Sequence, residues 1–121
     1  MCYRVRRKCN TQNYTGMEIP DITIDEEGYP TEEFLEWIRT YDCVKNSPFE
    51  FIQIILNEWH HGDYGWKIHR KYKGERKVFV STLGWSGNEE MIAAMRDNFA
   101  FWAFSYFSHQ RGGHYTFILD N

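Results

Sequence analysis

Residues 84–115 constrain the fold of this chain most, because a long helical pattern there carries an unusual density of aromatic side chains. Six of the nine residues in the range 99–107 are aromatic. A helix that is apolar on nearly every side must be buried on nearly every side. We therefore predict one buried helix, about 30 Å long, that begins near Gly87, ends before Gly112 and Gly113, and forms the centre of the domain.

The length and composition favour one domain with an ordinary hydrophobic core. The chain has 121 residues, of which 42% are hydrophobic, and this suits a single domain. We assign residues 17–121 to that domain and residues 1–16 to a basic N-terminal appendage. No apolar run approaches the roughly 20 residues that span a bilayer. We therefore expect a soluble cytoplasmic protein with no membrane partner.

Local signals predict two helices in the first half of the domain. Thr31 is a suitable N-cap for a helix that reaches about residue 42. Ser47 and Pro48 mark the start of a second helix, because serine caps a helix and proline suits its first position. Histidines and then Gly62 follow the apolar stripe of this second helix, so we expect it to end near residue 61.

Strand patterns follow the two helices. Residues 66–72 place alternate side chains on two faces, and residues 77–82 are rich in β-branched and aromatic side chains. A glycine-containing turn joins the two segments, which predicts a β-hairpin. Residues 114–119 alternate in the same way and predict a last strand. The predicted fold is a small α+β domain of order α-α-β-β-α-β. A helix between the second and third strands favours a parallel crossover, so we predict a three-stranded mixed sheet that packs on the long aromatic helix.

Charge is segregated along the sequence, although the net charge is only −3. Residues 17–36 contain eight acidic residues and no lysine or arginine. The predicted hairpin concentrates basic residues between aromatic ones, an arrangement that suits phosphate contacts and base stacking. A nucleic-acid site on this hairpin would use Lys67, Arg70, Lys71, Lys73, Arg76 and Lys77.

The turn before the long helix is the first candidate ligand site. Gly84 and Gly87 allow close approach of a ligand to the backbone, and a helix N-terminus favours an anion. Ser86 and Asn88 add polar side chains, and Trp85 could stack on a ring. The structural alternative is a strand-to-helix turn in which Ser86 caps the helix and Trp85 joins the core.

The turn that precedes the last strand is the second candidate. Arg111 can grip a phosphate or carboxylate in a bidentate manner, and His114 can donate a hydrogen bond or act as a base. A straight helix would hold this turn about 30 Å from Ser86, so we expect at most one of the two turns to be a site. No pattern specifies a catalytic residue, a cofactor or a metal site, and we lean towards a protein that is not an enzyme.

Several of these motifs resemble a family of small hypothetical proteins from bacteriophages and prophages. The resemblance rests on Gly84-Trp85-Ser86-Gly87-Asn88-Glu89, on Phe101-Trp102 and on Arg111-Gly112-Gly113-His114-Tyr115, and it extends back to residues 25–33. It covers roughly residues 17–119 and implies a phage context inside a bacterial host. By analogy, it favours a protein that binds a host component.

Three functional hypotheses follow. The first is a non-enzymatic phage accessory protein that binds a host protein or a small anionic ligand, for example to counter host defence. The second is a protein that binds or hydrolyses nucleotides through Trp85, Ser86, Asn88, Arg111 and His114. The third is a nucleic-acid binder that uses the basic hairpin. The sequence leaves the partner and the oligomeric state open.

Overall fold

The computed structural model describes residues 19–60, 65–70 and 74–119. The appendage predicted for residues 1–16 lies outside this part of the chain. The described helices are α1 (Glu32–Thr40), α2 (Pro48–Asn57), α4 (Ser86–Asp97) and α5 (Phe99–Ser105), and the strands are β1 (Trp66–Arg70), β2 (Arg76–Ser81), β3 (Tyr106–Gln110) and β4 (His114–Leu119). This is a small α+β domain, as the sequence predicts.

Both N-terminal helices begin where their capping residues predict. The Thr31 hydroxyl accepts a hydrogen bond from the backbone N–H of Phe34 at 3.1 Å. The Ser47 hydroxyl accepts one from the N–H of Glu50 at the same distance. Helix α2 ends earlier than predicted, at Asn57 instead of residue 61. Helix starts are well predicted because a cap is a contact between neighbouring residues.

The sheet is four-stranded and antiparallel, with strand order β1-β2-β4-β3. The prediction of a three-stranded mixed sheet was therefore wrong. Strand β3 occupies residues that the sequence pattern assigned to the long helix. Because β3 reverses the chain before β4 begins, β2 and β4 pair antiparallel. Strands β2 and β3 are both antiparallel to β4, so they run in the same direction, and α4 and α5 connect them across β4.

A break at Asn98 divides the predicted long helix into α4 and α5. The Asn98 side chain accepts a hydrogen bond from the N–H of Phe101 at 3.2 Å and so caps α5. Its amide nitrogen donates to the carbonyl oxygens of Ile38 at 2.8 Å and Tyr41 at 3.0 Å. These contacts tie the break to the end of α1. The aromatic segment therefore becomes a short helix followed by a strand.

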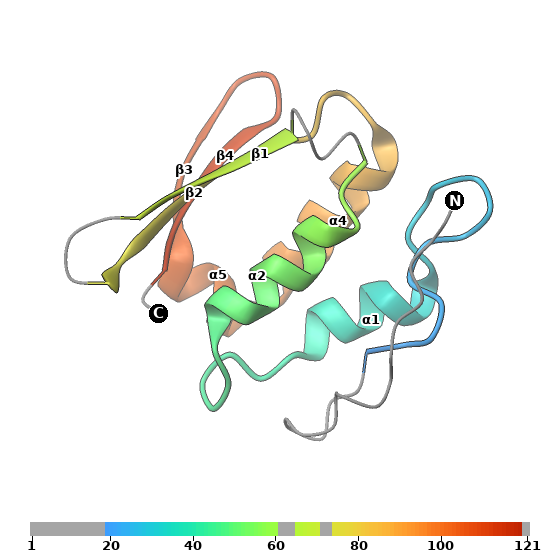
Figure 1. Ribbon diagram of the computed structural model, residues 1–121, viewed down its shortest axis with the longest axis horizontal. Helices are drawn as coiled ribbons and strands as arrows, with labels where there is room; N and C mark the ends of the chain where they lie inside the picture. The colour runs from blue at the N-terminus through green and yellow to red at the C-terminus, as the bar shows by residue number, and fades with distance from the viewer. Residues whose placement is uncertain (1–18, 61–64, 71–73, 120–121) are drawn as a thin grey trace.

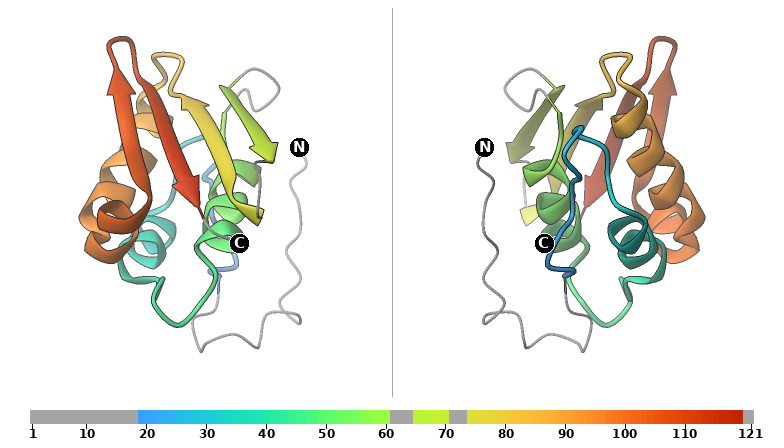
Figure 2. Two further views of the ribbon diagram at one scale, coloured as in Figure 1. Left: turned by 90° about the vertical axis from the view of Figure 1, so that its left-hand side faces the viewer. Right: turned by 90° about the vertical axis from the view of Figure 1, so that its right-hand side faces the viewer.

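The helices lie together on one face of the sheet, and the core fills the space between the two layers (Figures 1 and 2). Phe101 from α5 and Phe117 from β4 are fully buried in this core. Phe99 and Phe104, in contrast, are 81% and 78% exposed. The prediction that the aromatic segment is buried on every side was wrong for these residues, because α5 covers the sheet with only one side.

Candidate functional site

The two turns that the sequence singles out lie at the same end of the molecule. The backbone N–H of Thr82, which precedes the first turn, donates to the carbonyl oxygen of Gly113 in the second at 3.0 Å. One residue earlier, the Ser81 hydroxyl bonds the Nδ1 atom of His114. The predicted separation of about 30 Å was therefore wrong. Strand β3 carries the chain back along the sheet, and the β3–β4 turn consequently lies beside the β2–α4 turn.

Close packing at Gly113 provides a test of this junction. Gly113 and Gly74 both have φ of 81°, a left-handed conformation that costs a residue with a Cβ about 1 to 2 kcal/mol. A Cβ on Gly113 would also collide with the Thr82 hydroxyl, whereas a Cβ on Gly74 would meet open space. Gly113→Ala should therefore lower the free energy of unfolding by at least about 1 kcal/mol more than Gly74→Ala. Denaturant unfolding of both variants measures the difference, and equal losses would contradict the packing of the two turns.

Trp85 is held by stacking within the chain. Its ring lies 4.4 Å from the His60 ring at an interplanar angle of 23° and 4.8 Å from the Tyr29 ring at 42°. A Cβ on Gly87 would lie 2.7 Å from the indole nitrogen, so glycine is needed there. That nitrogen is buried and has no hydrogen-bond partner among the described residues. The aromatic surface of Trp85 is thus used to pack the turn against neighbouring segments.

Asn88 and Ser86 also make their contacts inside the fold. Asn88 is fully buried, and its oxygen accepts from the N–H of His60 at 3.0 Å. Its amide nitrogen donates to the carbonyl oxygens of His60 and Thr82, both at 3.2 Å. The Ser86 hydroxyl lies 3.0 Å from the Tyr29 hydroxyl. The helix N-cap is Trp85, with no side-chain capping bond, so the structural alternative in which Ser86 caps α4 was wrong on this point.

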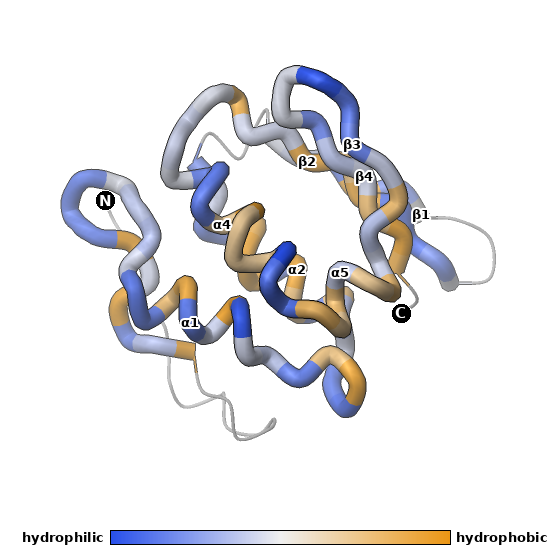
Figure 3. The backbone as a smooth tube through the Cα atoms, turned by 180° about the vertical axis from the view of Figure 1, so that it is seen from behind, coloured by the Kyte–Doolittle hydropathy of each residue, from blue (hydrophilic) through white to orange (hydrophobic). Residues whose placement is uncertain are grey.

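Arg111 and His114 remain on the surface. Arg111 is exposed in the β3–β4 turn, which Figure 3 shows as a strongly hydrophilic segment. His114 is exposed as well, and it pairs with Ser81 across the β2–β4 register. Both residues are therefore accessible at the end of the sheet where the two turns meet.

The face of the sheet opposite the helices carries the other accessible candidates. Lys77 of β2 lies between two aromatic rings, with its Nζ atom 5.6 Å from the ring centres of both Phe79 and Phe107. His69 of β1 makes an edge contact with Phe79 at 5.4 Å and 83°. The β3–β4 register shifts between residues 106 and 108, which makes Phe107 a bulge residue. Sequence reasoning missed Phe107 because the residue was assigned to a helix. We call this surface, formed by Lys67, His69, Lys77, Phe79, Ser81, Phe107, His114, Thr116 and Ile118, the open face.

Only part of the predicted basic cluster lies on the open face. Lys67 and Lys77 do, because they alternate with Trp66 and Val78, which face the helices. Arg76 faces the helices, with its guanidinium 4.2 Å from the centre of the Phe49 ring. Lys71 and Lys73, and the side chain of Arg70, lie outside the described residues. The predicted group of six is therefore divided between two faces of the sheet.

Charge is distributed unequally between the two layers of the domain. None of the residues in β1, β2, β3 and β4 is acidic. Helix α1 and the first half of α4, in contrast, expose Glu32, Glu33, Glu36, Glu89 and Glu90. The segregation seen along the sequence thus becomes a spatial one: the sheet is basic and the helix layer is acidic.

Other candidate chemistry finds little support in the described part of the chain. No group of three or more His, Cys, Asp or Glu residues there is placed to hold a metal ion. Cys43 is a free thiol, and burial, followed by the nearby charge of Asp42, raises its pKa to about 12. A thiol with such a pKa is almost fully protonated at neutral pH and is a poor nucleophile.

None of the described helices has the length and apolar character needed to cross a membrane.

Comparisons of the chain with protein-family models, with curated proteins and with solved structures found no match.

Proposed function

We propose that this protein binds single-stranded nucleic acid on the open face of its sheet. One observation carries the proposal: Lys77 lies between the exposed rings of Phe79 and Phe107 on a sheet whose strands contain no acidic residue. A cation flanked by accessible rings offers a phosphate contact beside two stacking surfaces. The proposal keeps the expectation of a binding protein and specifies the surface and the ligand.

The two rings are placed to receive separate bases. Phe79 is 36% exposed and Phe107 is 57% exposed, so each offers aromatic surface to the solvent. Because both ring centres lie 5.6 Å from the same Nζ atom, they are no farther apart than twice that distance. Stacking on such rings requires bases that are not paired in a duplex. The geometry therefore favours a single strand.

Basic groups continue beyond the rings towards one end of the sheet. Lys67 is the register partner of Phe79 on the open face, and the His114 side chain, a potential hydrogen-bonding group, lies on the same face at the start of β4. Arg111 adds a further cation, exposed in the β3–β4 turn that leads into β4. A strand that crosses the rings can therefore place its phosphates against several cations. The net charge of −3 does not oppose this contact, because the exposed glutamates identified above belong to the helix layer.

The nucleotide hypothesis receives less support from the same geometry. It required Trp85 and Asn88 to contact a ligand. Trp85 stacks on His60 and Tyr29, and the amide of Asn88 is occupied by backbone groups. The phage context and the bacterial host remain predictions, and single-stranded nucleic acid is one host component that fits them.

Binding of fluorescent oligouridine and oligothymidine tests the proposal. We expect both to bind more tightly than a duplex of equal length. Affinity should fall by roughly tenfold between about 50 mM and 200 mM salt, as for about two to three phosphate contacts on a single strand. Lys77→Glu should remove most of the binding, because it replaces the cation beside the two rings by a carboxylate that repels the phosphate backbone.

A matched charge change separates this surface from a general charge effect. Glu90→Lys alters an exposed residue of α4, in the helix layer, and changes the net charge by two units in the opposite direction to Lys77→Glu. We expect its oligonucleotide affinity to stay close to that of the native chain. Absence of binding at low salt, or an equal affinity for duplex and single strand, would refute the proposed function.

A further inference from the structure

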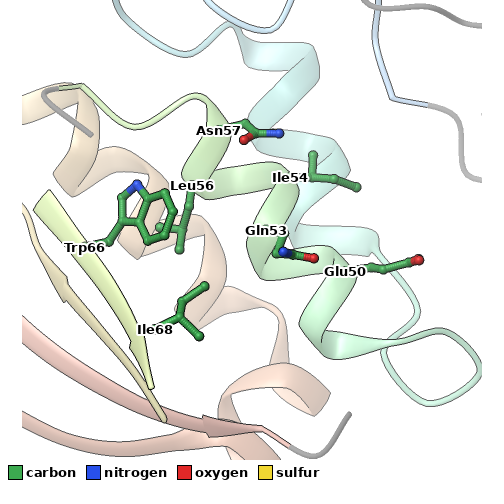
Figure 4. Close-up of a pocket in the computed structure, with 7 residues that line it drawn as sticks. All are labelled: Glu50, Gln53, Ile54, Leu56, Asn57, Trp66 and Ile68. Atoms are coloured by element: carbon green, nitrogen blue, oxygen red, sulfur yellow. The ribbon is translucent and has the colours of Figure 1, made fainter. Parts of the chain in front are cut away.

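A groove separates helix α2 from strand β1, on the side of the sheet away from the open face. It encloses a pocket of about 360 Å³. Figure 4 shows the side chains of both elements around this pocket, with Trp66 and Leu56 close together. The pocket is lined by Glu50, Gln53, Ile54, Leu56, Asn57, Trp66 and Ile68.

One side of α2 forms the helical wall of the groove. Glu50, Gln53, Ile54 and Asn57 follow the spacing i, i+3, i+4, i+7, which aligns side chains along one side of a helix. The buried stripe of α2, which includes Ile52 and Ile55, is a different one. The wall spans about 10 Å at 1.5 Å per residue, which is the length of about three residues of an extended chain.

Strand β1 forms the opposite wall and is an edge strand. Only β2 pairs with it among the described residues, so its outer edge offers unpaired backbone donors and acceptors. An extended chain with backbone N–H and carbonyl groups would therefore suit this strand edge.

The lining also specifies the side chains of an occupant. Leu56, Trp66 and Ile68 supply apolar surface, and Gln53 and Asn57 add neutral amides. Glu50 is the charged lining residue, and its side chain is exposed on the helical wall. This combination complements an apolar side chain that has a basic side chain next to it on the same side of an extended chain.

We propose that this groove binds an extended peptide that pairs with the outer edge of β1, places an aliphatic or aromatic side chain in the pocket and sets a basic side chain against Glu50. Strand addition supplies affinity through main-chain hydrogen bonds, and the pocket for alternate side chains supplies selectivity. The site is independent of the proposed nucleic-acid surface, because its lining side chains project from the other side of β1.

Synthetic nonapeptides test this inference. The first probe is acetyl-Ser-Thr-Lys-Thr-Leu-Thr-Val-Thr-Ser-amide, in which the lysine and the apolar residues share one side of an extended chain. A second probe has the same residues in reverse sequence order and tests the opposite strand direction. Each of the two probes also has a matched version in which glutamate replaces the lysine. Calorimetry should show at least one lysine peptide binding about tenfold more tightly than its glutamate version. Hydrogen exchange at the outward-facing amides of β1 should slow when that peptide is bound.

Charge reversal in the protein makes the test specific. Glu50→Lys should invert the preference in favour of the glutamate peptide, whereas Glu90→Lys on α4 should leave the preference unchanged. The milder Glu50→Gln should abolish the preference without reversing it, and circular dichroism verifies that each variant is folded.

Methylation of the peptide backbone tests the pairing itself. One set of peptides is N-methylated at odd positions and a second set at even positions. The two sets should differ in affinity for the protein, because only one set of peptide N–H groups faces β1. Equal binding of both sets would show contact through side chains alone, as for a small molecule, and would overturn the inference. It would also be overturned if no peptide bound at millimolar concentration, or if Glu50→Lys kept the native preference.

Discussion

Phe107→Ala should weaken the binding of single-stranded oligonucleotides by about tenfold or more. Stacking of one base on an aromatic side chain contributes about 1 to 3 kcal/mol, and tenfold corresponds to about 1.4 kcal/mol. Phe107 is 57% exposed and lies at a bulge, so its removal should disturb the fold little. Phe79→Ala combined with Phe107→Ala should reduce binding further, because two stacking surfaces are lost. Fluorescence anisotropy at low salt measures both effects.

Phe104 provides the matched control for this prediction. Its side chain is 78% exposed, more than that of Phe107, but it belongs to α5 and not to the open face. Phe104→Ala should leave the affinity unchanged, and Phe107→Tyr should retain most of the binding because it keeps a ring. If Phe104→Ala weakened binding as much as Phe107→Ala, the oligonucleotide would be contacting exposed apolar surface without preference for the open face.

Asn98→Ala should lower the free energy of unfolding by about 2 to 5 kcal/mol. The variant removes the α5 cap and leaves the carbonyl oxygens of Ile38 and Tyr41 without the donor that they bond in the native chain. Asn98 is only 4% exposed, so water replaces these contacts poorly. Urea unfolding followed by circular dichroism measures the loss.

Two further variants show which contacts of Asn98 matter. Asn98→Asp keeps the acceptor for the Phe101 N–H and replaces the donor by a carboxylate that faces two carbonyl oxygens. We expect a loss as large as that of alanine at neutral pH, because the donor contacts hold the break in place. Asn57→Ala, at an exposed position at the end of α2, should change stability by less than about 0.5 kcal/mol. If Asn98→Asp were as stable as the native chain, capping alone would explain the role of Asn98.

The elements that the sequence predicts correctly depend on contacts between near neighbours. The caps at Thr31 and Ser47 lie three residues from the N–H groups that they bond. The β1–β2 hairpin joins two alternating segments across a short turn. Local hydrogen bonding and side-chain alternation determine these features, and both can be read from a short segment.

The helix break at Asn98 could not be predicted in this way. Its amide nitrogen bonds Ile38 and Tyr41, which lie 60 and 57 residues earlier in the sequence. Without these partners, the aromatic segment has the local pattern of a continuing helix. Strand β3 pairs with β4, the next strand along the chain, so this pairing is itself local. It was missed because its residues were assigned to the helix, whose end depends on the distant contacts of Asn98. Because β3 was missed, the predicted sheet had one strand too few, and the predicted distance between the two turns was too long.

The sequence also identified candidate residues, but it did not identify the neighbours that contact each of them in the fold. It selected Lys67, Lys77 and His114, which lie on the open face, but it grouped Trp85 and Asn88 with the ligand-binding residues. Residue type predicts the chemistry that a side chain can perform. Whether a side chain is occupied within the fold depends on segments that approach from elsewhere, as His60 approaches both Trp85 and Asn88.

By itself, the sequence determined the α+β class, the starts of the first two helices, the hairpin and the segregation of charge. These follow from propensity, alternation and composition, which act over short stretches of chain. Only the tertiary structure decided that the aromatic segment of residues 99–107 divides into a helix and a strand, that its Phe107 lies beside Lys77, and that the turns around it meet. Those features depend on hydrogen bonds and packing between residues far apart in the chain, and no local pattern encodes them.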